Sequence, residues 1–277
     1  MTSEPSFDIS DEDLEVILYD VVELYGYDFT NYSRASLRRR VTRLILKDRF
    51  SSFAEFRFKV RSDKSYFKRF VEEITVNVTE MFRDPMFYRS LRDYVLPMLA
   101  PLPMIRVWHA GCSTGEEVYS MAIVLHEAGL LKKSLLYATD INPTVLERVR
   151  LGVYPISQMK QYSENYILSG GKNDFSSYYT AQYDSVKFDD FLGKRIVLAT
   201  HNLVSDRSFN EFQLILCRNV MIYFDKAFQD RVLHLFYDSL EMLGYLALGS
   251  KETLKFTDIG KKFRQLDNRE KIWRKVN

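Results

Sequence analysis

Cysteine is scarce in this chain of 277 residues, which contains only Cys112 and Cys217. Neither cysteine has a neighbour at the spacing of a zinc site, so we expect a reduced, metal-free protein. Long apolar runs are also lacking, since none approaches the ~20 residues that span a bilayer. The acidic start of the chain, Met1 to Glu15, lacks the basic and apolar parts of a secretory signal. We therefore expect a cytoplasmic protein that does not insert into the membrane.

The chain has little excess charge of either sign, because 39 basic residues face 37 acidic ones and the net charge is +2. Domains that bind nucleic acid are usually far more basic, so no nucleic-acid partner is expected. The charge is nevertheless uneven along the chain, and one stretch predicts a positively charged surface. Between residues 33 and 49, Asp48 is the single acidic residue against Arg34, Arg38, Arg39, Arg40, Arg43, Lys47 and Arg49.

The first part of the chain has the spacing of helices. Ser10 precedes an acidic, apolar-periodic stretch and is typical of a helix N-cap. Farther on, apolar residues at i, i+4, i+7 and i+8 form a core-facing stripe, which consists of Leu37, Val41, Leu44 and Ile45. Another face of the same helix carries Arg39, Arg40, Arg43 and Lys47. Two more helical patterns end near residue 74, and together these patterns predict an all-helical domain over residues 1–84.

After residue 100, short apolar runs alternate with helical patterns. Strands are predicted at Met104–His109, Leu135–Thr139, Arg195–Thr200, Phe212–Cys217 and Tyr245–Leu248, with Glu270–Val276 as a closing edge strand. Helices are predicted at Glu116–Glu127, Pro143–Leu151 and Lys226–Leu240. This alternation predicts an α/β domain with a mostly parallel sheet over residues 85–277. Residues 153–195 are polar and tyrosine-rich instead, and we interpret them as a small inserted β-subdomain.

The strongest local pattern is a strand that runs into Gly111-Cys-Ser-Thr-Gly115 and then into a helix. The two glycines allow a tight turn and a close approach of a ligand to the backbone. A helix start offers N–H groups to anions, but Glu116 and Glu117 would repel an anion here. A ligand with positive charge or hydroxyl donors fits better. S-adenosylmethionine is such a ligand, because it carries a sulfonium, an ammonium and a ribose.

Polar residues also follow other predicted strands, at the edge where open α/β sheets bind ligands. Asp140 ends the second strand and is a candidate for binding ribose hydroxyls. Asn142 is the better cap for the helix that follows, which leaves Asp140 free for a ligand. Arg218 and Asn219 end a later strand. The sequence therefore predicts a ligand site at this edge of the sheet.

Five motifs in order make the chain resemble the CheR-type protein-glutamate methyltransferases. They are Asn77-x-Thr79-x-x-x-Arg83, the Gly111–Ser120 turn, Ala138-Thr-Asp140-Ile, Asn202-Leu203 and Cys217-Arg218-Asn219-Val-Met-Ile-Tyr223-Phe. The resemblance implies a Rossmann-like class I methyltransferase sheet, with S-adenosylmethionine as methyl donor, S-adenosylhomocysteine as product and no metal. It implies a cofactor pocket lined by Asn77, Thr79, Arg83, Glu117, Asp140, Asn202, Leu203, Arg218 and Asn219. It also places Arg83 and Tyr223 beside the transferred methyl group, although each alone is typical of a surface charge or a core aromatic residue.

The implied reaction agrees with elementary acid–base chemistry. A glutamate side chain, with a reference pKa of about 4.3, is already ionised at neutral pH and needs no general base. The four histidines are therefore interpreted as structural; they are His109, His126, His201 and His234. The enzyme's task is to align the reactants for in-line displacement. We expect Arg83 or Tyr223 to hold the substrate carboxylate by hydrogen bonds.

The resemblance also suggests a purpose for the basic helix, because methylatable glutamates lie on acidic helical surfaces. Arg39, Arg40, Arg43 and Lys47 would steer the acidic helices of a chemoreceptor or another signalling protein towards a monomeric enzyme. A merely solvated helix face is an equal alternative from sequence alone.

Two segments depart from the family pattern. Gly249-Ser-Lys-Glu-Thr replaces a Gly-His-Ser-Glu-like string, and the insert does not match the version that grips a receptor's C-terminal peptide.

Three other functions fit parts of the sequence. An amino-methylating enzyme acting on nucleic acid would carry an Asn/Asp-Pro-Pro-Tyr/Phe string, whereas Asn219 is followed by Val-Met-Ile. A non-catalytic module that binds S-adenosylmethionine for signalling would not need Arg83 and Tyr223, which are both present. A nicotinamide-dependent dehydrogenase would carry Gly-x-Gly-x-x-Gly at the first turn, which is absent here.

Overall fold

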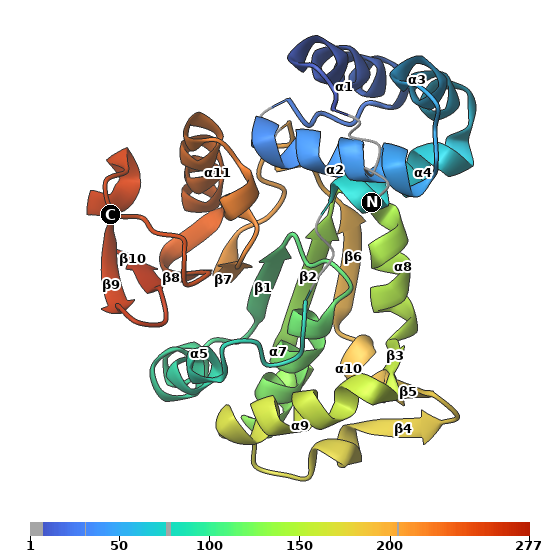
Figure 1. The fold of residues 1–277 in the computed structure, drawn as a ribbon. Coiled ribbons are helices and arrows are strands. Elements are labelled where there is room, and N and C mark those ends of the chain that lie inside the picture. Colours follow the sequence, from blue (N-terminus) through green and yellow to red (C-terminus); the bar gives the residue numbers. More distant parts are fainter. Residues whose placement is uncertain (1–7, 31, 76–78, 204) are drawn as a thin grey trace. The chain divides into compact units, whose positions relative to one another are not determined.

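The computed structural model describes residues 8–30, 32–75, 79–203 and 205–277 (Figure 1). Contacts within the chain divide it into two compact units. The helical unit comprises Met1–Val76 and Tyr223–Phe228, and the sheet unit comprises Asn77–Ile222 and Gln229–Asn277. Each unit has its own core and its own set of predicted functional residues, so the two are described separately.

The helical unit begins with a capped helix. Its helices in the described residues are α1 (Asp11–Tyr25), α2 (Arg34–Lys47), α3 (Phe53–Ser62) and α4 (Lys64–Ile74). Ser10 caps α1 as predicted, because its hydroxyl accepts a hydrogen bond from the Asp13 N–H at 3.0 Å. The Asp13 carboxylate in turn accepts one from the Ser10 N–H. This reciprocal pair satisfies two N–H groups that a helix start leaves without partners.

The apolar stripe predicted for α2 is buried in the core of the helical unit. Its members, each at most 1% exposed, are Leu37, Val41, Leu44 and Ile45. A buried carboxylate ties α1 to α3, since Asp20 accepts hydrogen bonds from the guanidinium groups of Arg57 and Arg61. The helical period therefore identified the core face of α2 correctly.

A short segment far along the sequence completes the helical unit. The Ser33 N–H donates a hydrogen bond to the Tyr223 carbonyl at 2.8 Å. Tyr32 forms an isolated antiparallel bridge with Phe224, and their rings meet edge to face with centroids 5.0 Å apart. Tyr223, predicted to lie beside the methyl group, thus belongs to the helical unit.

The sheet unit is built on a seven-stranded sheet in the order β6-β2-β1-β7-β8-β10-β9. Its strands are β1 (Ile105–Ala110), β2 (Ser134–Asp140), β6 (Ile196–Thr200), β7 (Phe212–Cys217), β8 (Leu240–Leu248), β9 (Phe263–Asp267) and β10 (Ile272–Lys275). The first five strands in this order pair in parallel, whereas β10 pairs antiparallel with both of its neighbours, β8 and β9. The predicted mostly parallel sheet is confirmed. Strand β8 begins at Leu240, ahead of its predicted start at Tyr245, whereas the other predicted strands lie close to their observed bounds.

One prediction about the sheet is wrong. The strand expected at Glu270–Val276 is β10, but it lies between β8 and β9, so β9 forms the edge instead. The sequence of β9, Phe-Arg-Gln-Leu-Asp, carries too few apolar residues to predict a strand. An edge strand with a solvated face does not need them, because it buries only one side.

Helices follow the strands as expected for repeated βαβ units. They are α7 (Glu116–Glu127), α8 (Pro143–Leu151), α10 (Asp190–Gly193) and α11 (Lys226–Ser239), whose first turn belongs to the helical unit. Two short helices, α5 (Pro85–Ser90) and α6 (Leu96–Leu99), precede β1. The bounds predicted for α7 and α8 are those observed, and α11 ends one residue earlier than predicted. A π-helical turn at Leu91–Val95 joins α5 to α6, and this stretch was not among the predicted helices.

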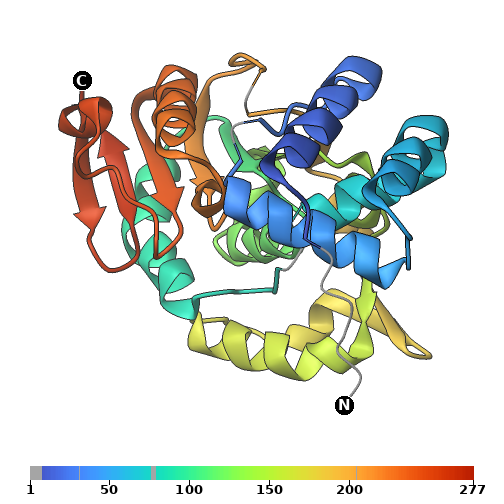
Figure 2. The same ribbon diagram turned by 45° about the horizontal axis from the view of Figure 1, so that its top comes forward.

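The insert contains the predicted small sheet together with a helix that was not predicted. Its antiparallel strands are β3 (Val153–Pro155), β5 (Ser185–Phe188) and β4 (Tyr179–Gln182), in that order. Between β3 and β4 lies α9 (Met159–Leu168), drawn in yellow-green in Figure 2. The polar, tyrosine-rich sequence of α9 hides its helical period, because tyrosine rings rather than aliphatic side chains form its buried face.

A buried carboxylate anchors the insert to the rest of the sheet unit. Glu127, at the end of α7, accepts hydrogen bonds from the hydroxyls of Tyr166 and Tyr178 and from the Lys172 N–H. Its other oxygen pairs with Arg92 of the π-helical turn. Because a buried charge needs several partners, this cluster fixes the insert against α7.

Candidate functional site

The turn after β1 has the shape that the two glycines were predicted to permit. Gly111 and Gly115 have φ angles of 75° and 91°. A Cβ on Gly111 would lie 2.7 Å from the Val220 side chain, and one on Gly115 would lie 2.7 Å from Val149. Left-handed backbone and crowding together restrict both positions to glycine. The turn therefore packs closely between the loop after β7 and helix α8.

Asp140 ties the first turn to the end of β2. Its carboxylate accepts hydrogen bonds from the Ser113 N–H at 2.9 Å and the Asn142 N–H at 3.0 Å. Burial raises the pKa of Asp140, and these N–H groups act in the opposite direction. Asn142 caps α8 by accepting a hydrogen bond from the Thr144 N–H, which confirms the predicted cap. The hydroxyl of Ser113 is buried without a hydrogen-bond partner among the described residues.

The two neighbouring glutamates at the start of α7 have different surroundings. The Glu117 carboxylate lies 2.9 Å from Nδ1 of His109 and 3.3 Å from the Arg218 guanidinium. Burial pushes the pKa of Glu117 upward, but the His109 hydrogen bond and the charge of Arg218 outweigh it and hold the pKa below the usual value. Glu116 accepts a hydrogen bond from the Thr114 hydroxyl at 2.6 Å, and burial raises its pKa to about 7. Glu117 is therefore the residue of the pair that carries a full negative charge at neutral pH.

Arg218 connects the end of β7 to the Arg83–Asp84 loop. Its side chain, 3% exposed, forms ion pairs with Asp84 at 2.7 Å and with Glu117. It also donates a hydrogen bond to the Arg83 carbonyl at 3.2 Å, and its guanidinium lies 4.0 Å from the centre of the Phe87 ring. A cavity of about 290 Å³ opens beside it, with Asp84, Arg218, Ser250 and Glu270 among its lining residues.

The loop that carries Thr79 and Arg83 is fixed from two directions. The Phe82 N–H donates a hydrogen bond to the Ser120 hydroxyl of α7, and the Asn165 amide of α9 donates one to the Met81 carbonyl. Phe82 adopts a φ of 52°, and Asp84 a φ of 56°. Left-handed backbone at such residues is costly and clusters at functional sites. Asn77 lies outside the described residues.

The backbone of Asn219 is one of several N–H donors around the carboxylate of Glu252, a residue that the five motifs do not include; this set of donors is called the Glu252 cradle. The carboxylate of Glu252 accepts hydrogen bonds from the N–H groups of Gly249, Asn219 and Val220 at 2.6, 3.1 and 3.0 Å. Burial raises the pKa of Glu252, while these N–H groups favour its charged form. The sequence did contain a signal for Glu252, because it stands where the Gly-His-Ser-Glu-like string of the family ends in glutamate.

The end of β6 brings a further predicted pair to the same edge of the sheet. The His201 N–H donates a hydrogen bond to the Asp140 carbonyl at 3.2 Å, so the residues after β6 start beside the end of β2. Asn202 donates its N–H to the Asp206 carboxylate, and Leu203 is buried. The sheet unit thus gathers the predicted cofactor residues that follow β1, β2, β6 and β7.

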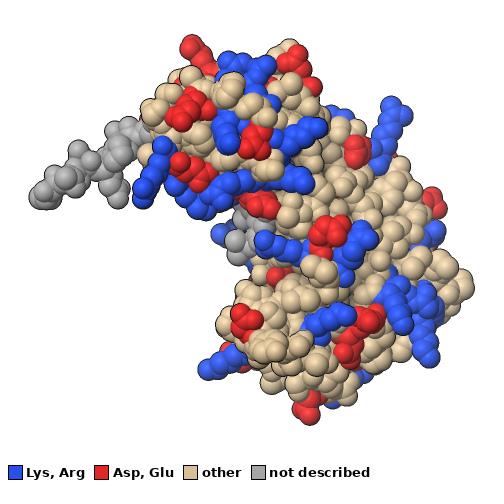
Figure 3. Space-filling view, turned by 90° about the vertical axis from the view of Figure 1, so that its right-hand side faces the viewer, with Lys and Arg blue, Asp and Glu red and all other residues tan. Residues whose placement is uncertain are grey.

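The predicted docking residues belong to the helical unit, where folding brings acidic partners to the basic segment. Glu73 of α4 pairs with Arg43 at 3.1 Å and with Lys47 at 2.5 Å. Arg40 lies over the Tyr223 ring, 5.7 Å from its centre. Arg39 is exposed. Figure 3 shows the resulting surface of the helical unit, with blue and red side chains intermixed. The positive face is therefore smaller than the sequence suggests.

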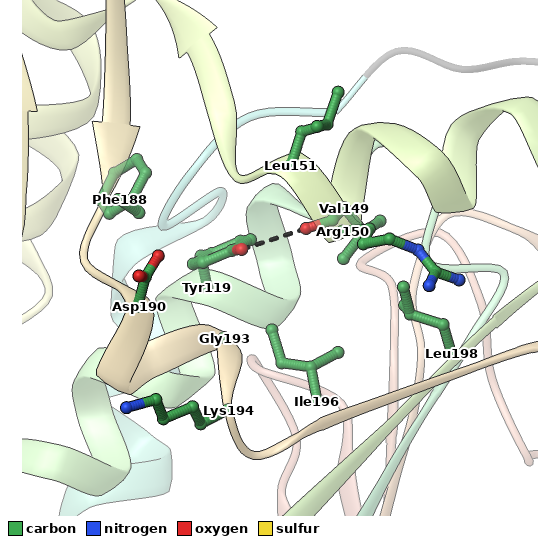
Figure 4. Close-up of a pocket in the computed structure, with 10 residues that line it drawn as sticks. All are labelled: Tyr119, Val149, Arg150, Leu151, Phe188, Asp190, Gly193, Lys194, Ile196 and Leu198. Carbon is green, nitrogen blue, oxygen red and sulfur yellow. Dashed lines mark hydrogen bonds between the residues drawn. The ribbon is translucent and has the colours of Figure 1, made fainter.

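A second cavity in the sheet unit lies away from the predicted cofactor residues (Figure 4). Its volume is about 500 Å³, and α8, α10 and the start of β6 contribute most of its lining. Tyr119 points across it and donates a hydrogen bond to the Val149 carbonyl at 3.0 Å. The strands of the main sheet run away from this end, so the cavity is separate from the edge that carries Asp140.

Metal-ligand clusters and membrane-spanning helices are both lacking among the described residues. Within residues 8–30, 32–75, 79–203 and 205–277, no group of three or more histidine, cysteine, aspartate or glutamate side chains is placed to hold a metal ion. In the same residues, no helix is both long and apolar enough to cross a membrane.

Comparison with known families finds two matches that together span most of the chain. Residues 77–272 match the family model described as CheR methyltransferase, SAM binding domain. Residues 12–75 match the CheR methyltransferase, all-alpha domain. Both matches agree with the resemblance drawn from the motifs, and they follow one another as the helical and sheet-forming parts of the sequence do.

Individual relatives carry related names. "Putative methyltransferase Cher3" of Pseudomonas putida is 44% identical over 275 residues, which cover 99% of this chain and 100% of that protein. The chemotaxis protein methyltransferase of Listeria innocua is 31% identical over 231 residues, covering 83% of this chain and 85% of its own. Chemotaxis protein methyltransferase 2 of Pseudomonas aeruginosa is 34% identical over 239 residues, covering 80% and 77%.

Proposed function

The chain belongs to the CheR methyltransferase family, and on that premise we propose that it methylates glutamate side chains of a partner protein with S-adenosylmethionine as donor. The partner we propose is a chemoreceptor, because relatives are named chemotaxis protein methyltransferases. Residues 1–84 would dock the substrate, residues 85–277 would carry the methyltransferase site, and residues 153–195 would form the insert. The observation that carries the proposal is the joint match of both CheR domains in one chain.

The first turn suits the proposed methyl donor. Glu117 offers an ionised carboxylate and Asp140 a carboxylate at the end of β2, so the turn favours ammonium and hydroxyl groups over phosphates. The buried Ser113 hydroxyl is free to bind a ligand as far as the described residues show. We assign the donor to Asn77, Thr79, Arg83, Glu117, Asp140, Asn202, Leu203, Arg218 and Asn219. When bound, S-adenosylmethionine would supply a sulfonium-bound methyl group that passes to a nucleophile, with the thioether as leaving group.

The acceptor needs orientation rather than activation. A glutamate carboxylate is ionised at neutral pH, so its oxygen attacks the methyl carbon without a base, and the sulfonium sulfur leaves as a neutral thioether. Arg83 would hold the acceptor carboxylate by charge-assisted hydrogen bonds, and Tyr223 would donate a hydrogen bond from its hydroxyl. Holding reactants in line can contribute up to about 7–11 kcal/mol. The remaining carboxylate oxygen then faces the methyl group.

We expect Arg83→Ala and Tyr223→Phe to lower turnover at least tenfold and to lower donor affinity by far less, because both residues orient the acceptor, although Arg83 is also assigned to the donor. Methyl-labelled S-adenosylmethionine and receptor-containing membranes measure turnover, and calorimetry measures affinity. Lys251→Gln, an exposed neighbour of the Glu252 cradle, is the control. Label that resists mild alkali would contradict the ester, and normal turnover in both variants would contradict the assigned roles.

A further inference from the structure

His109 is the histidine of the chain most closely involved with a proposed cofactor residue. It lies on β1, its side chain has no exposed surface, and its Nδ1 is 2.9 Å from Oε1 of Glu117. A carboxylate only accepts hydrogen bonds, so Nδ1 carries the proton and donates it. Nε2 is buried without a hydrogen-bond partner among the described residues. Among the described residues, Nδ1 is therefore the only ring nitrogen that is hydrogen-bonded, and its partner is Glu117.

The other oxygen of Glu117 is held from a different strand. Arg218, at the end of β7, lies 3.3 Å from Oε2 and is itself paired with Asp84. One carboxylate is thus held by side chains from the neighbouring strands β1 and β7, with both oxygens engaged. It nevertheless keeps 16% of its side chain exposed. That geometry leaves acceptor lone pairs for a ligand and allows the side chain few alternative rotamers.

We propose that His109 is a positioning residue for the methyl donor, acting through Glu117. The proposal rests on the proposed cofactor role of Glu117 and deepens it. Removing the Nδ1 donor would leave the carboxylate held by Arg218 alone and would allow the Glu117 side chain more rotamers. The ring makes no contact that the methyl transfer itself requires, so its effect is on donor binding rather than on the reacting atoms.

The test is calorimetric titration of the full chain with S-adenosylhomocysteine. His109→Leu removes the donor while keeping an apolar side chain in the strand, and we expect the dissociation constant to rise about tenfold. His109→Asn places an amide N–H near the former Nδ1 and should restore the constant to within about threefold of the wild type. If His109→Leu does not fold, a large loss of affinity in His109→Asn would still overturn the proposal.

A double-mutant comparison separates positioning from general damage. Glu117→Gln should weaken binding by itself. Adding His109→Leu to Glu117→Gln should then weaken it by less than about twofold more, because His109 no longer has a carboxylate to orient. Independent, multiplying losses would overturn the proposal. These readouts involve no methyl acceptor, so a chain that binds S-adenosylhomocysteine as predicted but esterifies no glutamate would refute the proposed function and leave the role of His109 intact.

Discussion

At the scale of single residues, adjacent glutamates acquire different charges from their surroundings. Burial dominates the surroundings of Glu116, which accepts a hydrogen bond from the Thr114 hydroxyl, whereas Glu117 meets an imidazole N–H and a guanidinium. Sequence reasoning chose Glu117 as the cofactor ligand by resemblance alone. The structure adds a physical difference between the two, because an ionised carboxylate attracts a cationic donor and a partly protonated one does so less.

The raised pKa of Glu116 predicts a pH-dependent stability. Between the ordinary value of 4.5 and about 7 the folded protein binds this proton more tightly than the unfolded chain does. The free energy of unfolding therefore falls as pH rises through that window, by about 3 kcal/mol in all. Glu116→Gln removes this contribution, so urea unfolding should show the variant more stable than the wild type at pH 8 and equal to it below pH ~4.5. The exposed Glu147→Gln is the matched control, and parallel curves for Glu116→Gln and wild type would contradict the assignment.

At the scale of elements, helix α2 separates a buried stripe from a charged face that is only partly available. Arg43 and Lys47 form ion pairs with Glu73. Arg40 lies over the Tyr223 ring and donates a hydrogen bond to the Glu73 carbonyl. Arg39 is exposed, and no hydrogen bond or ion pair holds it within the part of the chain that the structure describes. Arg39 is therefore the residue of the proposed docking face with most freedom to meet an acidic partner.

We expect Arg39→Glu to raise the Michaelis constant for the protein substrate about fivefold at low salt without changing kcat, because it acts on encounter rather than on chemistry. The difference should vanish at about 0.5 M salt, where screening is strong. Lys68→Glu, the same charge reversal on an exposed position of α4, should have little effect. Equal effects of the two reversals would favour a merely solvated helix face.

Elements with a clear apolar period could be predicted from the sequence, and those without one could not. The parallel strands, α7 and α8 follow from alternation of apolar runs with capped helices. Helix α9 was missed because its buried residues are tyrosines and a methionine among polar neighbours, and β9 because an edge strand needs few apolar residues. In the site, capping rules alone predicted that Asn142 rather than Asp140 caps α8. The hydrogen bonds of Glu252 to the backbone and the contact of His109 with Glu117 depend on tertiary packing, which no local sequence pattern predicts.

At the scale of the whole molecule, the predicted functional residues are divided between two compact units. The sheet unit holds the carboxylates and arginine assigned to the methyl donor. The helical unit holds the basic face and, through the returning segment Tyr223–Phe228, the tyrosine assigned to the acceptor. Arg83, which is assigned to both the donor and the acceptor, lies in the sheet unit. We expect substitutions on the basic face of the helical unit to change the encounter with the protein substrate, and substitutions at Glu117 and His109 to change donor affinity. The variants of Arg39 and His109 test this separation from opposite sides.

The central claim is that this chain forms methyl esters on protein glutamates. The most direct measurement is peptide mass spectrometry of a purified chemoreceptor cytoplasmic domain after incubation with the protein and S-adenosylmethionine. The account predicts an added methylene on glutamate side chains of the receptor helices, lost on mild alkaline treatment and absent without the enzyme. A methyl group on lysine, on arginine or on added nucleic acid, with unmodified receptor glutamates, would contradict it.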